Sequence, residues 1–187
     1  MAIFRRAMLE EQIGNWEGAK NLLESIPVLY PDTRAALEAP LAIVSRYVRA
    51  RDSKAAQAAV ERAIATYESL ASRDSTSTYA PLYRWNLFRC QVTLGNWKEA
   101  IGIVEDMARA YPEHPVVAQA LLEGAQLANR NKDRDAARRL LSRFVVLYPK
   151  SPLISDVRRE LDALGPPPAV VARPPGFPLL SFATSKR

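Results

Sequence analysis

An internal repeat restricts what this chain can fold into. Two segments, beginning at Gly14 and Gly95, share the order Gly-Asn-Trp-x-x-Ala and then Tyr-Pro starting fourteen residues after the tryptophan. A third segment keeps these offsets with Arg134 in place of the tryptophan, and a weaker copy at Ser53 has Glu68 in place of the proline. The copies start at residues 16, 53, 97 and 134. Self-similarity at such a period is typical of an array of stacked supersecondary units.

The repeated segments have the pattern of amphipathic helices. In the first copy, Leu22, Leu23 and Ile26 recur at helical spacing. In three copies a proline follows the tyrosine and ends the helix, because proline cannot continue it. No stretch of the sequence alternates apolar and polar residues as a β-strand would. Further helices of similar length are expected near residues 2–13, 33–50, 78–94, 115–130 and 151–164.

The repeated unit resembles the second helix of a tetratricopeptide repeat (TPR). The residues that fit the consensus of that family are Gly14, Trp16, Ala19, Pro31, Gly95, Trp97, Ala100, Pro112, Ala137 and Pro149. The resemblance implies an all-α fold, a right-handed superhelical array of antiparallel helix pairs with about nine helices. The predicted domain spans 1–164, with repeats near 2–31, 33–70, 78–112 and 115–149 and a capping helix at 151–164.

Segment 147–152, Leu-Tyr-Pro-Lys-Ser-Pro, is similar to the spacer of bacterial envelope TPR proteins, which include outer-membrane assembly lipoproteins and the periplasmic partner of the Tol–Pal system. That resemblance implies a bacterial protein. The sequence has no apolar run long enough for a spanning helix and no apolar secretion core after Met1. We expect a cytoplasmic protein as the sequence is written, and a periplasmic or envelope protein if N-terminal residues have been removed.

The sequence lacks the residue clusters that catalysis and metal binding need. Cys90 is the only cysteine and His114 the only histidine, which excludes disulfides within the chain, sites of several thiolates and histidine-rich metal sites. Adjacent acids such as Glu10 and Glu11 do not face each other on a helix. We expect no enzyme, no catalytic residues, no metal and no cofactor.

A TPR array implies a protein that assembles other proteins. We expect a scaffold or adaptor for protein–protein interaction that binds a partner protein or peptide through its concave helical face. Two alternatives stay open. One is a permanent structural subunit of a larger, membrane-associated complex, anchored by the tail, so that any membrane contact is indirect. The other is a nucleic-acid-binding repeat protein, which the uneven repeat spacing disfavours because such proteins keep a strict period.

In this family the first helix of each pair mainly faces the concave side, which implies where a partner binds. Tyrosine and tryptophan supply contact area with few rotors, and arginine adds planar hydrogen bonding. Tyr83 and Arg89 are expected to be exposed, whereas Trp85 either packs in the core or contacts the partner. The candidate groove residues are Tyr79, Tyr83, Arg84, Trp85, Arg89, Arg46, Arg49 and Arg5.

Positive charge is concentrated in the last third of the chain. The net charge is +6, but residues 1–129 carry −1 and residues 130–187 carry +7. A run of arginines is either a solvated helix face or a docking patch for an acidic protein, an anionic lipid surface or nucleic acid. The candidate basic patch consists of Arg130, Arg134, Arg138, Arg139 and Arg143.

A proline-rich tail at 165–187 follows the predicted domain. Six prolines between Pro166 and Pro178 favour extended polyproline geometry. The tail is either a flexible terminus or a strap. A strap would lie across a partner protein or along the helical repeats of the same chain. The strap would use its apolar residues, which are Val170, Val171, Phe177, Leu179, Leu180 and Phe182.

Overall fold

The computed structural model describes residues 2–73 and 77–165, and over these residues it contains nine α-helices and no strand. This confirms the all-α prediction. The predicted strap residues lie outside the described part of the chain. The helices are α1 (Ala2–Gln12), α2 (Trp16–Leu29), α3 (Arg34–Arg49), α4 (Ser53–Arg73), α5 (Ala80–Leu94), α6 (Trp97–Ala110), α7 (Pro115–Arg130), α8 (Arg134–Leu147) and α9 (Ile154–Ala163).

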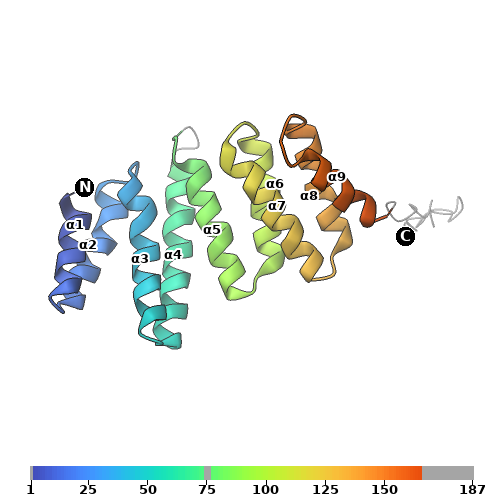
Figure 1. Cartoon of the computed structure of the whole chain (residues 1–187). Helices are drawn as coiled ribbons and strands as arrows, with labels where there is room; N and C mark the ends of the chain where they lie inside the picture. Colours follow the sequence, from blue (N-terminus) through green and yellow to red (C-terminus); the bar gives the residue numbers. More distant parts are fainter. Residues whose placement is uncertain (1, 74–76, 166–187) are drawn as a thin grey trace, which may run out of the picture.

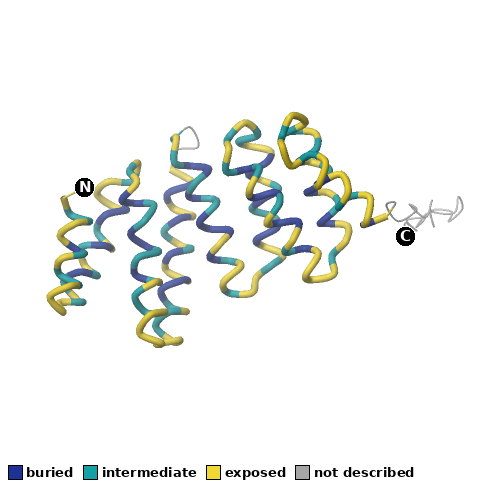
Figure 2. The backbone as a smooth tube through the Cα atoms, viewed as in Figure 1, coloured by how far each residue is buried: buried dark blue, intermediate teal, exposed yellow. Residues whose placement is uncertain are grey.

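The helices form an elongated row from α1 at one end to α9 at the other (Figure 1). Each helix packs against the next one in sequence, and α5 also packs against α3 and α7. The buried residues lie where helices face one another, as Figure 2 shows. They form two hydrophobic clusters, one within residues 7–90 and one within residues 88–164, and the partly buried Ile103 packs against both.

A left-handed turn precedes the second helix in all four copies of the repeat. Gly14 and Gly95 have φ angles of 86° and 80°, in the region that favours glycine. Arg51 and Lys132 stand at the same offset in the other two copies, and their φ angles are 57° and 63°. The left-handed turn is therefore present in all four copies, including the two that have no glycine at this position.

The residue after this turn caps the second helix in three of the copies. The side chains of Asn15, Asp52 and Asp133 each accept a hydrogen bond from the backbone N–H three residues later, at 3.1, 3.0 and 2.9 Å. Such a cap satisfies one of the N–H groups that a helix leaves unpaired at its start. The starts of α2, α4 and α8 are thus fixed locally by two consecutive residues.

Tyr148, which follows the last residue of α8, ties its repeat to the repeat before it. The Tyr148 hydroxyl donates to the carbonyl of Pro112 at 2.7 Å, and both residues belong to Tyr-Pro pairs. The two repeat tryptophans, Trp16 and Trp97, are both partly buried, each with a cation near its ring. The Arg46 guanidinium lies 5.5 Å from the Trp16 ring centroid, and the Lys98 ammonium lies 5.4 Å from that of Trp97.

Two helix ends differ from the sequence prediction. Helix α4 has 21 residues and ends at Arg73, beyond the predicted limit of residue 70, whereas α2, α6 and α8 each have 14. The physical reason is Glu68, which stands where the other copies have proline, so that no residue stops the helix. Helix α9 begins at Ile154 and not at Ser151, because the Ser151 hydroxyl accepts from the N–H of Leu153 within a preceding turn.

Candidate protein-binding groove

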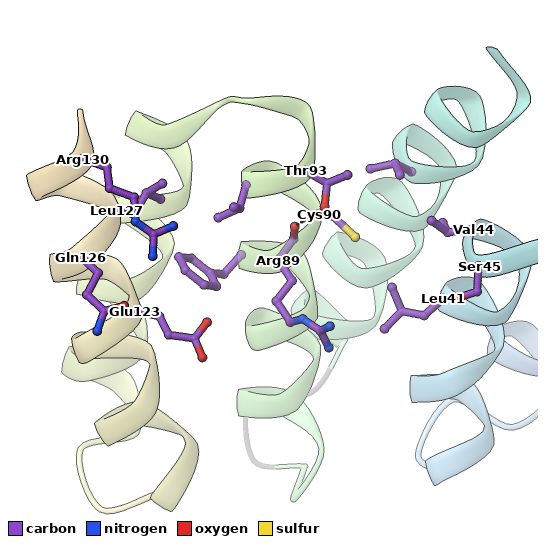
Figure 3. A pocket seen from close by; sticks show the side chains of 13 residues that line it. Leu41, Val44, Ser45, Arg89, Cys90, Thr93, Glu123, Gln126, Leu127 and Arg130 are labelled. Atoms are coloured by element: carbon purple, nitrogen blue, oxygen red, sulfur yellow. Dashed lines mark hydrogen bonds between the residues drawn. The ribbon is translucent and has the colours of Figure 1, made fainter. Parts of the chain in front are cut away.

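The first helices of the pairs form one face of the row, here termed the inner face, and this face is hollowed. A hollow of about 520 Å³ lies among α3, α5 and α7 (Figure 3), and a second of about 420 Å³ lies among α1, α3 and α5. The two hollows share Leu41, Ser45 and Arg89, so they form one continuous inner groove. The larger hollow is lined by Leu41, Val44, Ser45, Val60, Phe88, Arg89, Cys90, Val92, Thr93, Glu123, Gln126, Leu127 and Arg130.

Exposed charges stand among the apolar residues of the inner groove. Arg89 of α5 is exposed, and its guanidinium has no acidic partner in the described residues. Glu123 of α7 is also exposed, and its carboxylate accepts a hydrogen bond from the Gln119 side chain at 2.9 Å without meeting a cation there. Arg130 is exposed at the last residue of α7. These groups can pair with charges on a bound molecule.

Cys90 borders the inner groove, but its thiol lacks the properties of a nucleophile. Its side chain is buried, and this burial raises the pKa of the thiol to about 11. A nucleophilic cysteine needs its thiolate form near neutral pH. Cys90 therefore acts as a small packed residue.

The prediction that Tyr83 is exposed is wrong. Tyr83 is 1% exposed, and its hydroxyl donates to the carbonyl of Pro31. Its ring stacks on that of Tyr79 with centroids 6.2 Å apart, and burial is the main cause that raises the pKa of its phenol to about 12. The physical reason is that α5 packs against α3, α4, α6 and α7, which cover most of its surface.

The neighbouring residues of α5 also pack against other helices. Trp85 is partly buried, and its ring stacks on Phe88 at a centroid distance of 5.1 Å. Arg84 is partly buried as well, with its guanidinium 5.8 Å from the Tyr111 ring centroid. Neither Trp85 nor Arg84 lines the inner groove.

Two of the three predicted arginines outside α5 join α1 to α3. Arg46 and Arg49 of α3 both form ion pairs with Glu11 of α1, at 3.4 and 3.0 Å. Arg5 is exposed on α1. Among the eight candidate groove residues, all of which lie in the described part of the chain, Arg89 is the one that lines the two hollows of the inner groove.

The structure distributes the five arginines of the candidate basic patch over several places. Arg130 lines the inner groove. Arg134 is exposed at the first residue of α8. The Arg138 side chain is only 15% exposed and donates to the carbonyls of Leu164 and Gly165 at 2.8 and 2.7 Å, so it caps the C-terminal end of α9.

The remaining two arginines of the patch belong to a hollow between α6 and α8. This hollow has a volume of about 470 Å³ and is lined by Arg109, Arg139 and Arg143 together with Glu105. Arg139 pairs with Glu105 at 3.1 Å. The patch is therefore a set of separate environments, because helix α8 turns successive arginines toward different neighbours.

The sequence prediction missed most residues that line the inner groove. Leu41 and Ser45 lie four residues apart on α3, and Glu123, Leu127 and Arg130 follow helical spacing on α7. Helical spacing alone could have grouped each of these sets. No sequence signal showed which strip of each helix remains uncovered.

The described residues hold no group of three or more histidine, cysteine, aspartate or glutamate side chains arranged for a metal ion. Among the same residues, no helix combines the length and the apolar character needed to cross a membrane.

Comparisons with known proteins agree with this architecture. A model of the tetratricopeptide repeat family matches residues 1–33 and 119–151, which contain α1 with α2 and most of α7 with α8. No curated protein matches the chain in sequence.

Solved structures with the same fold include the nearly identical TPR-like repeats of a Podosopora anserina protein described as a kinesin light chain. They share 19% sequence identity over 87% of this chain and 83% of that chain, with a TM-score of 0.53. A point variant of those repeats gives the same values. The MamA protein is 14% identical over 87% of this chain and 84% of its own, with a TM-score of 0.50. The two matched repeats and the array of helix pairs support a tetratricopeptide repeat protein, and the solved structures show that the described residues have the fold of such an array.

Proposed function

We propose that the chain is a non-catalytic scaffold that binds an extended segment of a partner protein in the inner groove. The observation that carries the proposal is the continuity of the two hollows across α1, α3, α5 and α7. TPR proteins typically bind protein partners and are generally non-catalytic. A groove that crosses several helices suits a chain segment better than a compact small molecule.

The composition of the groove supports the same proposal. Leu41, Val44 and Leu127 offer apolar surface, and Arg89 and Glu123 offer charges that form no ion pair within the described residues. Interfaces commonly combine an apolar centre with polar groups that fix orientation. In this proposal the apolar residues supply most of the affinity, and the charges select the partner.

The test is to block the groove and ask which partners are lost. Ser45 is exposed and belongs to both hollows, so Ser45→Trp should fill the groove without disturbing the buried clusters. Ser69→Trp is a matched control, because Ser69 is exposed on α4 and lines none of the described hollows. Each form is used to capture proteins from cells that contain the chain naturally, and a circular-dichroism melt confirms that it is folded.

The proposal expects partners that bind the wild type and Ser69→Trp and are lost with Ser45→Trp. Equal capture by all three forms would refute binding in the groove. A chain truncated after Gly165 tests the structural-subunit alternative in the same experiment. Partners that are lost on truncation but kept by Ser45→Trp would favour anchoring by the tail.

A further inference from the structure

Opposite charges stand on neighbouring helices of the inner groove. Glu123 projects from α7 toward α5, and Arg89 projects from α5 toward α3 (Figure 3). Both side chains are exposed, and neither forms an ion pair within the described residues. A segment that crosses the groove therefore meets an acidic side chain at one helix and a basic side chain at the next.

The typical spacing of packed helices is close to the repeat of an extended peptide. Helices α5 and α7 contact each other, and the axes of packed helices are typically about 8–10 Å apart. A polyproline helix returns to the same side every three residues and rises about 9 Å over that distance. Side chains at positions i and i+3 of such a segment would then lie over successive helices on the same side.

Arg130 does not cancel this arrangement. It lies seven residues after Glu123 on α7, which corresponds to about 10 Å along the helix axis. That distance is close to the screening length at physiological salt, so Arg130 weakens the field at Glu123 only modestly. The pair that a crossing segment meets remains Glu123 and Arg89.

We infer that the groove selects an extended protein segment with one acidic and one basic side chain three residues apart. This inference rests on the proposed function. The acidic side chain pairs with Arg89, the basic one pairs with Glu123, and apolar residues between them contact Leu41, Val44 and Leu127. A segment with the wrong sign at either position is rejected, because like charges placed together at an interface are strongly unfavourable.

The test uses a displayed library of random twelve-residue peptides, selected on the immobilised full chain. Three variants are selected in parallel, namely Arg89→Glu, Glu123→Arg and the control Arg143→Glu. Arg143 lines the separate hollow between α6 and α8, so its replacement makes the same charge change as Arg89→Glu, but outside the groove. Signs of charge are compared without regard to peptide direction, since an extended segment can lie in a groove either way.

The wild type and Arg143→Glu should select peptides with an acid and a base three residues apart. Arg89→Glu should select two basic residues at that spacing, and Glu123→Arg should select two acidic ones. A synthetic peptide from the wild-type selection should bind each groove variant at least about tenfold more weakly than the wild type.

Selection on Ser45→Trp separates the two ways of failing. If no peptide is enriched on the wild type, or if its peptides bind Ser45→Trp equally well, the proposed function fails. If the peptides need an open groove but lack the charge pair, or keep the same charges on Arg89→Glu and Glu123→Arg, the charge inference is overturned while the groove proposal stands.

Discussion

Replacing Gly95 by alanine should destabilise the protein by about 1 kcal/mol, although the new methyl group meets no other atom. Gly95 has a φ of 80°, and a Cβ built on it finds nothing within 4 Å. The cost is therefore conformational. A left-handed residue with a Cβ loses about 1–2 kcal/mol, and alanine recovers roughly 0.4–1 kcal/mol by restricting the unfolded chain.

Gly102 provides the matched control. It lies inside α6, and a Cβ built there also finds nothing within 4 Å. Because alanine is favoured over glycine in a helix interior by about 1 kcal/mol, Gly102→Ala should stabilise the protein by about that amount. The two variants make the same chemical change in open space, yet their free energies of unfolding should differ by about 2 kcal/mol.

Urea unfolding followed by circular dichroism measures this difference, provided that both variants keep the wild-type dependence of stability on urea. In thermal melts the midpoints should differ by roughly 6 °C, since 1 kcal/mol corresponds to about 2–4 °C for a chain of this length. If Gly95→Ala is as stable as Gly102→Ala, the left-handed turn does not control the start of the second helix and the argument is refuted.

Three further predictions concern single side chains. His114 caps α7 by accepting a hydrogen bond from the N–H of Val116 at 3.2 Å, and burial lowers the pKa of its imidazole below the ordinary 6.5. As the pH falls, the unfolded chain therefore takes up a proton before the folded chain does, so the free energy of unfolding should fall as the pH drops through 6.5. His114→Asn should flatten this pH dependence, which urea titrations at several pH values measure. Arg138→Met should remove the donors at the end of α9 and speed hydrogen exchange of its amides by about tenfold, with α7 unchanged as the internal control. Cys90 should resist a thiol reagent at pH 8 until urea unfolds the chain, and prompt labelling of the folded form would contradict its burial and its pKa of about 11.

The left-handed turns show how much of the local structure the sequence could predict. Glycine at residues 14 and 95 signals such a turn directly. Arg51 and Lys132 give no comparable signal, because a residue with a Cβ adopts this conformation only when surrounding structure holds it there. These two copies are recognised from the alanine and the tyrosine, which stand at the same positions in all four copies of the repeat.

The binding face was harder to predict than the fold. Tyr83 has the composition of an interface residue, but it is buried because four helices surround α5. Arg138 has the composition of a surface charge, but it caps α9 across a separation of more than twenty residues. Residue type indicates what a side chain can do, and the neighbours decide whether it remains free to do it.

The sequence by itself determined the helices and most of their ends, because glycine, capping side chains, apolar periodicity and proline act within a few residues of the chain. The tertiary structure decided which strip of each helix stays open, since that depends on helices distant in sequence. Leu41, Arg89 and Glu123 come from three different helices, and only the stacking of repeats brings them into one groove.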